Sequence, residues 1–309
     1  MKEREGNITD SPDHKNPIRK GGEEKKMISV LLCTLNRPVQ IRDCISSFLD
    51  QTYSDFEIIV VDQSKDDLTK KSCEEFDDRR IKYHKVNFTG LSRARNYGLR
   101  FVQGEWICLG DDDAVYDRDF FSKAYDFLKD YKKVCILCGK LLFLDDKRKE
   151  AMNYKDYHSG QELKVDDMMQ IGASATLVLQ SELLNTIKGF DPIFGVGARY
   201  GSGEESDVVL RMFERGIKAY YIPEMKVFHG YSTTNAFEDI KKVFLYYTGL
   251  GALLKKHLWY RKNINLLPKF FRATLGAWIK WIVGNRNQKC IYRARIVGFY
   301  KGFFNYNLI

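Results

Sequence analysis

Short, almost wholly apolar runs alternate along the chain with stretches whose apolar residues recur at helical spacing. Apolar runs of this length are typical of strands covered on both faces, and the spaced stretches are typical of amphipathic helices. The predicted strands are 28–33, 56–61, 81–85, 106–109, 133–138 and 173–179. The predicted helices are one that begins at Pro38 and those at 66–76, 92–102 and 119–128. This alternation indicates right-handed crossovers and a Rossmann-like, mostly parallel α/β sheet with flanking helices.

The pattern becomes less regular after residue 138. Residues 139–170 are charged and lack a clear period, which predicts a loop. Short helices are expected from Ser181 to Gly189 and over 204–215, the latter ended by Gly216. Asp207 and Arg211 are spaced for an i,i+4 ion pair on that second helix. Two short extended pieces are predicted at 220–222 and 226–228.

The two ends of the chain differ from its middle. Residues 1–26 are polar and charged and predict a disordered leader. Residues 236–309 predict two or three helices, and 241–309 hold fourteen Lys and Arg but no Asp or Glu. Because charges interrupt its apolar runs, this segment is not expected to span a bilayer.

Three interpretations of the basic, aromatic C-terminal segment remain open. Aromatic residues mixed with Lys and Arg suit a helix lying on an anionic membrane surface, which is our prediction for 241–309. The alternatives are that its apolar stripes pack on the rest of the protein, or that its charge binds nucleic acid. No nucleic-acid module accompanies the charge, so we expect no nucleic-acid partner.

Cysteine use gives no sign of disulfides or a zinc site. Seven cysteines are scattered along a chain that shows no secretory signal, which is typical of a reducing, cytoplasmic compartment. Cys135 and Cys138 have CxxC spacing but lie in an apolar run with no second pair. They are expected to be buried strand thiols.

The strongest chemical signal is Asp111-Asp112-Asp113, directly after the predicted strand 106–109. Adjacent carboxylates repel one another unless a cation lies between them. The carboxyl ends of strands are where open α/β sheets bind ligands, and Mg²⁺ or Mn²⁺ prefers such hard oxygen ligands. An isolated acidic triplet can also be a solvated loop.

Polar residues also follow the first two strands. Thr34, Asn36 and Arg37 come after the first, and Asp62, Gln63 and Ser64 come after the second. An acidic side chain at this edge can accept from a ribose hydroxyl or a base N–H. The chain contains neither GxGxxG nor GxxxxGK[ST], so it does not match the motifs of dinucleotide oxidoreductases or P-loop NTPases.

Taken in order, six blocks resemble the family-2 inverting glycosyltransferases, which have the GT-A fold. The blocks are LCTLNRP at 32–38, IVVDQS at 59–64, GLSRARNYG at 90–98, the acidic triplet, GEESDVVLR at 203–211, and His229 followed by Ser232. The resemblance implies a catalytic domain over 27–235. Residues 27–113 would form its nucleotide-binding half and 114–235 its acceptor-binding half.

The resemblance also implies roles for individual residues. Asp113, Asp111 and His229 would hold a divalent metal, Mn²⁺ or Mg²⁺. The donor nucleotide would be bound by Thr34, Asn36, Arg37, Asp62, Ser64, Arg95, Asp111 and Asp112. Glu205 would be the general base and Glu204 its acceptor-binding partner. Because the family usually has Glu-Asp where this chain has Glu-Glu, the assignment between these two stays open.

The implied reaction is transfer of one sugar from a nucleoside-diphosphate sugar, expected to be UDP-linked, to a hydroxyl of a glycan or polyprenyl-linked acceptor. Such a reaction would serve cell-surface polysaccharide synthesis at the cytoplasmic face of the inner membrane. The absence of a QxxRW block argues against a processive synthase. A nucleotidyltransferase, or a non-catalytic nucleotide-sugar-binding module of the same fold, is the alternative.

Overall fold

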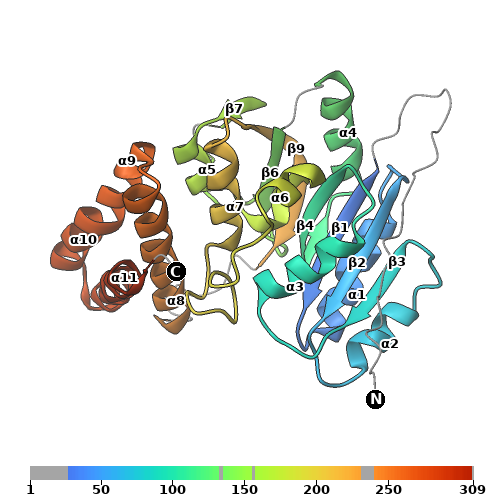
Figure 1. Ribbon diagram of the computed structural model, residues 1–309, viewed down its shortest axis with the longest axis horizontal. Coiled ribbons are helices and arrows are strands. Elements are labelled where there is room, and N and C mark those ends of the chain that lie inside the picture. The colour runs from blue at the N-terminus through green and yellow to red at the C-terminus, as the bar shows by residue number, and fades with distance from the viewer. Residues whose placement is uncertain (1–26, 132–134, 155–156, 231–239, 308–309) are drawn as a thin grey trace, which may run out of the picture.

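The chain forms a central sheet with helices on both faces, and its C-terminal helices gather on one side (Figure 1). The structure, a computed structural model, describes residues 27–131, 135–154, 157–230 and 240–307. The leader predicted at 1–26 and the motif residue Ser232 lie outside the described residues. In the described part, nine strands follow the order β3-β2-β1-β4-β8-β6-β9-β5, with β7 paired to β9.

The first half of the sheet is parallel, as the alternating pattern predicts. It contains β1 (Ile28–Thr34), β2 (Phe56–Asp62), β3 (Ile81–Lys85) and β4 (Trp106–Asp111). The connecting helices are α1 (Pro38–Leu49), α2 (Leu68–Glu74) and α3 (Leu91–Gly98). Every residue of β1 and β2 is buried, which explains why their sequences are nearly all apolar.

The second half of the sheet mixes strand directions. Strand β8 (Leu177–Gln180) runs antiparallel between β4 and β6 (Cys135–Leu142), and β6 is parallel to β9 (Lys218–His229). Strands β5 (Ala114–Tyr116) and β7 (Gln161–Leu163) are antiparallel to β9. The helices here are α4 (Phe120–Asp130), α5 (Val165–Ile171), α6 (Ser181–Thr186) and α7 (Glu204–Phe213).

Three expectations for this half were wrong. The predicted strand 173–179 begins only at Leu177, because Ser174–Thr176 form a 3-10 turn. The stretch 139–170 is not one irregular loop, because it contains the end of β6 together with β7 and α5. The pieces predicted at 220–222 and 226–228 are parts of the single strand β9. Cys135 and Cys138 are free and fully buried in β6, which confirms the prediction of strand thiols.

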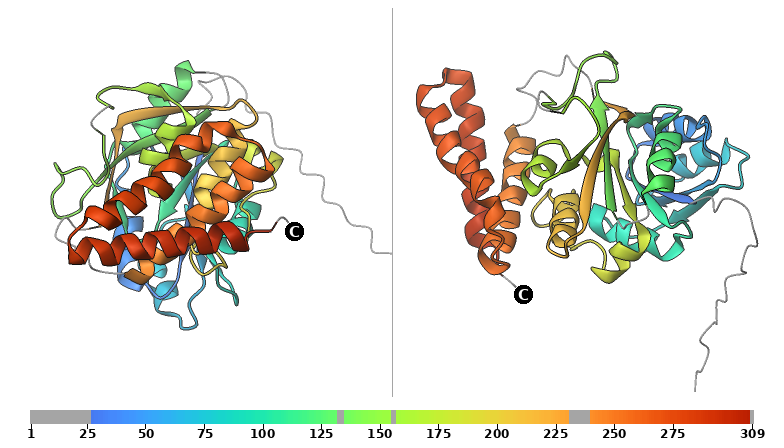
Figure 2. Two further views of the ribbon diagram at one scale, coloured as in Figure 1. Left: turned by 90° about the vertical axis from the view of Figure 1, so that its left-hand side faces the viewer. Right: turned by 90° about the horizontal axis from the view of Figure 1, so that it is seen from above.

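The C-terminal segment is helical throughout most of its described length. It comprises α8 (Ile240–Leu254), π-helical turns at Lys255–Tyr260 and Arg272–Gly276, α9 (Leu267–Phe271), α10 (Ala277–Val283) and α11 (Arg286–Asn305). Figure 2 shows α8 between the sheet domain and the outer helices. Within the described ranges, no helix has the length and apolar character needed to cross a bilayer.

Helix α8 packs on the sheet domain, so the packing interpretation holds for this part of the segment. Leu253, Leu254 and Phe299 share a buried cluster with Phe194 and Leu210 of the sheet domain. By contrast, several large apolar side chains of the outer helices stay exposed to solvent. These are Phe271, Leu275, Trp278, Ile279, Ile282 and Val283.

A buried charge network also joins α7 to the turn after α8. The predicted pair is confirmed, since Arg211 Nε donates to Asp207 Oδ2 at 2.8 Å. Asp207 Oδ1 also contacts Lys256 Nζ at 2.6 Å and His257 Nε2 at 2.8 Å, and His257 Nδ1 lies 2.8 Å from Glu214 Oε1. Burial would raise the pKa of Asp207, but the His257 hydrogen bond and the nearby cations lower it below its usual 3.8.

Close packing of α8 against α11 depends on glycine, which gives a testable prediction. A Cβ at Gly302 would lie 1.9 Å from Thr248 O and 3.0 Å from Ala252 N, both backbone atoms. Because backbone cannot yield as a flexible side chain can, Gly302→Ala should destabilise the protein by about 1–3 kcal/mol in chemical denaturation. Gly276→Ala is the matched control, since no atom lies within 4 Å of its Cβ position. It should stabilise by about 0.5–1 kcal/mol.

Candidate active site

The carboxyl ends of β1, β2 and β4 bring the predicted donor-binding residues together. The strand register places Thr34 beside Asp62 and Cys33 beside Asp111. Asn36 adopts a left-handed conformation with φ of 57°, and its backbone N–H donates to Ser64 Oγ at 2.8 Å. The loops after β1 and β2 are thereby joined at one edge of the sheet, where ligands of open α/β sheets bind.

The buried side chains at this edge differ in how many of their hydrogen bonds are made within the protein. Thr34 is buried and its hydroxyl has no well-oriented hydrogen-bond partner in the described part of the chain. Asp62 is also buried, and its two oxygens accept from Ser64 N–H at 2.8 Å and from the Tyr83 hydroxyl at 2.7 Å. In this structure Asp62 therefore fixes the loop, whereas the Thr34 hydroxyl lies beside Asp112 and opposes the rise that burial causes in the pKa of that carboxyl.

Two basic side chains contact the carboxylates of the acidic triplet. Arg37 Nη1 donates to Asp112 Oδ1 at 2.8 Å and to Asp113 Oδ2 at 2.6 Å. His229 Nε2 lies 3.0 Å from Asp113 Oδ1. The short strand β5 explains this contact, because it begins after Asp113 and pairs Ala114 with His229. Residues far apart in sequence thus meet through one antiparallel ladder.

The carboxylates of the triplet are in unequal electrostatic environments. Burial would raise the pKa of Asp113, but the His229 hydrogen bond and the charges of His229 and Arg37 lower it to about 2. Burial raises the pKa of Asp111, despite the opposing effect of Arg95. The pKa of His229 is raised chiefly by its hydrogen bond to Asp113. Asp113 is therefore the carboxylate best prepared to stay ionised.

The chemistry of Asp111, Asp113 and His229 fits a divalent cation. Two carboxylates and an imidazole are acceptable ligands for Mn²⁺, and the carboxylates also suit Mg²⁺. Across the described ranges, no three His, Cys, Asp or Glu side chains converge as a preformed metal cluster. Asp113 is instead in contact with Arg37 and His229, and a metal bound by Asp113 would have to displace the Arg37 ion pair.

Arg95 lies deeper in the protein than a residue that contacts the donor nucleotide directly would be expected to lie. Its side chain is almost fully buried inside the protein. Its guanidinium lies 3.1 Å from Glu204 Oε1 and 3.5 Å from Asp111 Oδ1, and it donates to Ser174 Oγ at 2.6 Å. Because a buried cation is stable only when paired, Arg95 links the acidic triplet to the start of α7.

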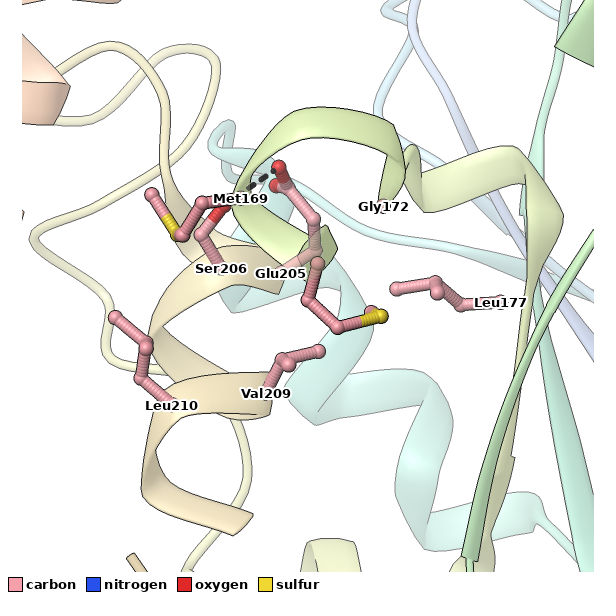
Figure 3. A pocket seen from close by; sticks show the side chains of 8 residues that line it. Met169, Gly172, Leu177, Glu205, Ser206, Val209 and Leu210 are labelled. Atoms are coloured by element: carbon pink, nitrogen blue, oxygen red, sulfur yellow. Dashed lines mark hydrogen bonds between the residues drawn. The ribbon is translucent and has the colours of Figure 1, made fainter. Parts of the chain in front are cut away.

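The two glutamates at the start of α7 point into different surroundings. Glu204 is buried and paired with Arg95. Glu205 lies against an apolar wall that includes Met168, Met169 and Leu177, and it accepts from Ser206 Oγ at 3.2 Å (Figure 3). Burial, and then the charge of Glu204, raise the pKa of Glu205 above its ordinary 4.5. A glutamate with a raised pKa and no cation in contact is typical of a general base.

Sequence reasoning missed residues that approach the site from the C-terminal segment. Lys242 and Tyr246 lie on α8, which packs on the loop before Glu204, where Ser202 Oγ donates to Tyr246 O at 3.1 Å. The charge of Lys242 acts on His229, and those of Glu205 and Glu204 act on Tyr246. Gln63, which follows the second strand but was not assigned a role, joins two motif blocks by accepting from Gly90 N–H at 2.7 Å.

Solved structures with the same fold bind nucleotides or nucleotide sugars. S. aureus TarS 1–349 in complex with UDP matches with a TM-score of 0.56 and 16% identity, covering 89% of each chain. The mannosyltransferase PcManGT from Pyrobaculum calidifontis, in complex with GDP-Man and Mn²⁺, matches with a TM-score of 0.63 and 15% identity. It covers 90% of this chain and 87% of that one. These likenesses establish the GT-A type of fold.

Curated relatives carry glycosyltransferase names. The Streptococcus pneumoniae glycosyltransferase GlyG is 27% identical over 146 residues, or 46% of this chain and 47% of that protein. A Mycobacterium tuberculosis PGL/p-HBAD biosynthesis glycosyltransferase is 28% identical over 120 residues, 38% of this chain and 47% of that protein. The chain thus spans about half the length of these relatives.

The family profile described as glycosyl transferase family 2 matches residues 29–185, which is half of the chain. This range contains the parallel strands, the acidic triplet and Arg95. With the fold and the relatives' names, the match confirms the resemblance seen in the motif blocks, and the chain belongs to glycosyltransferase family 2.

Proposed function

We propose that this protein is a metal-dependent, inverting glycosyltransferase that moves one sugar from a nucleoside-diphosphate sugar to an acceptor hydroxyl. The observation that carries the proposal is the chain of contacts from Asp111 through Arg95 to Glu204, beside Glu205. In this proposal Asp111 would help to hold the cation that binds the donor's diphosphate, next to a glutamate with a raised pKa. In this proposal residues 27–113 bind the nucleotide and 114–235 bind the acceptor.

In the proposed reaction, Glu205 takes the proton from the acceptor hydroxyl as its oxygen bonds to the anomeric carbon. The bond from that carbon to the diphosphate oxygen breaks, and the nucleoside diphosphate leaves from the opposite face with the electron pair. Arg37 would stabilise the negative charge that develops there. A cation held by Asp111, Asp113 and His229 would supply further charge neutralisation when bound.

The donor is the finer part of this proposal. We favour a UDP-sugar, and TarS, which has the same fold, is solved with UDP and with UDP-GlcNAc. Thr34, Asn36 and Ser64 would contact the nucleotide, with Asp62 holding their loop. Asp111 and Asp112 would lie on its ribose or diphosphate side.

The function is tested by measuring thermal unfolding with a panel of nucleotide sugars in the presence of Mn²⁺. One UDP-sugar should raise the melting temperature, and turnover with acceptor should release UDP. Release of pyrophosphate would identify a nucleotidyltransferase instead. Stabilisation by a nucleotide sugar without turnover on any glycan or lipid-linked hydroxyl would identify a binding module. No response to any activated sugar with Mn²⁺ would overturn the proposal.

We further propose that residues 241–309 hold the enzyme on the cytoplasmic surface of the membrane, where a polyprenyl-linked acceptor for cell-surface polysaccharide would be met. The exposed apolar face of α10, together with the exposed basic residues Lys280, Arg286 and Lys289, supports this location. Apolar side chains would enter the interface while the basic residues contact anionic headgroups.

The membrane proposal predicts a loss of binding from one substitution on α10. Ile282 is 62% exposed, so Ile282→Glu should leave folding intact and remove an apolar side chain worth about 1.5–3 kcal/mol when buried in lipid. Sedimentation with anionic vesicles should show at least about tenfold weaker binding. Leu68→Glu, an exposed position on α2, is the control. Equal binding of both variants and the wild type would contradict the proposal.

A further inference from the structure

A groove runs between α8 and α11 outside the site described above. Its volume is about 530 Å³, within the usual range of roughly 300–1,000 Å³ for small-molecule sites. The lining residues are Ile240, Lys241, Phe244, Cys290, Arg293, Ala294 and Val297.

The lining combines an apolar surface with two cations. Ile240, Phe244, Ala294 and Val297 are apolar, and Ile240 and Val297 remain about half exposed. Neither Lys241 nor Arg293 forms an ion pair with any residue that the structure describes. The sequence from 241 to the end contains no Asp or Glu, and Glu238 and Asp239, which precede the groove, lie outside the described residues. The complementary occupant therefore has an apolar chain and an anionic group.

Helix α8 lines the groove on one face and contacts the loop before Glu204 on another. Lys241 lines it, and Lys242 follows on the adjacent face of α8, one turn before Tyr246, whose carbonyl oxygen accepts from Ser202 Oγ at 3.1 Å. On the same side as Lys242, α8 approaches the loop before Glu204 so closely that a Cβ at Gly249 would lie 2.1 Å from Ser202 Oγ. A molecule anchored in the groove could thus extend around α8 toward Glu205.

We propose that this groove binds the phosphorylated lipid that carries the acceptor, with the lipid chain between α8 and α11 and the phosphate on Lys241 and Arg293. The inference rests on the proposed transfer to a lipid-linked acceptor. A second copy of the chain is a poor occupant, because its basic C-terminal segment would place like charges together. Inorganic phosphate alone would leave the apolar lining uncovered.

Cys290 provides a direct test in the unmodified protein. It is exposed in the groove, whereas the other six cysteines are buried. Its rate of alkylation by N-ethylmaleimide, followed by intact mass, should fall as farnesyl phosphate is added below its micelle concentration. Farnesol should protect at least about tenfold more weakly, because it lacks the charged group. Inorganic phosphate should not protect.

Charge reversal at one lining position should separate the phosphate contact from the apolar contact. Arg293→Glu should weaken protection by farnesyl phosphate at least about tenfold and leave protection by farnesol unchanged. Arg286→Glu, on the same helix but outside the groove, is the matched control. In a transfer assay, Arg293→Glu should raise KM for the lipid-linked acceptor and leave stabilisation by the nucleotide sugar unchanged.

Several outcomes would overturn the inference. These are equal protection by farnesol and farnesyl phosphate, protection by inorganic phosphate alone, no effect of Arg293→Glu, or protection that tracks self-association with protein concentration. If the nucleotide sugar still stabilises the protein in those cases, the glycosyltransferase proposal survives and the groove assignment fails alone. If farnesyl phosphate protects Cys290 but no activated sugar stabilises the protein, the groove binds the lipid and the glycosyltransferase proposal fails.

Discussion

Glu205→Gln is expected to lower kcat about 10²–10⁴-fold, because glutamine cannot accept the proton of the acceptor hydroxyl. The side chains are nearly equal in size, so the apolar wall against Glu205 is retained. In the wild type, kcat/KM should rise with pH on an acid limb set above the ordinary glutamate value, because burial and Glu204 favour the protonated, inactive form of Glu205. That limb should vanish in Glu205→Gln.

Glu204→Gln is the matched comparison and should behave differently. It removes the carboxylate partner of the buried Arg95, so thermal stability should fall by about 1–3 kcal/mol. The acid limb of kcat/KM should remain, because Glu205 is intact. Glu205→Asp should recover part of the activity by restoring a carboxylate. If Glu204→Gln rather than Glu205→Gln removed the limb, the two roles would have to be exchanged.

Asp113→Asn should lower kcat on the order of 10²–10³-fold through loss of charge where the diphosphate leaves. Asp113 is the carboxylate of the triplet whose pKa is held low, and it faces both Arg37 and His229. Asparagine keeps the shape but removes the negative charge that a divalent cation needs. Steady-state release of UDP should be measured over a range of Mn²⁺ concentrations, with Mn²⁺ binding followed by electron paramagnetic resonance.

The control for this substitution is Asp43→Asn, an exposed carboxylate on α1 that lies outside the triplet. It should keep wild-type activity and the same Mn²⁺ dependence. Asp113→Asn should need at least about tenfold more Mn²⁺ for half its residual rate. A variant that lost activity but bound Mn²⁺ as the wild type does would show that Asp113 acts other than as a ligand.

The strands and polar loops of the nucleotide-binding half could be predicted from the sequence because each depends on a short run of neighbouring residues. Strands β1, β2 and β4 are buried on both faces, so their apolar runs mark their limits to within two residues. The polar residues that follow them meet because parallel strands end at one edge. The Asp207–Arg211 pair was also predictable, since both partners lie on one helix.

The parts that sequence reasoning missed depend on distant partners. Strand β5 has three residues and exists through its pairing with β9, more than a hundred residues later. Strand β9 was divided in two because Pro223 and Glu224 interrupt its apolar pattern. The contacts of Arg95 with Glu204 and of His257 with Asp207 produce no periodic pattern in the sequence. No role was predicted for His257.

The buried contacts of Asp207 with Lys256 and His257 should couple local unfolding of α7 to local unfolding of the C-terminal helices. Losing both contacts would leave Asp207 with Arg211 alone and its Oδ1 atom unpaired away from water, which typically costs about 1–3 kcal/mol. In native-state hydrogen exchange, backbone amides of α7 and of the turn Lys255–Tyr260 should therefore share one opening event. Proteolytic removal of the tail would then release the glutamate-bearing helix as well, so a tail-less fragment is not a simpler enzyme.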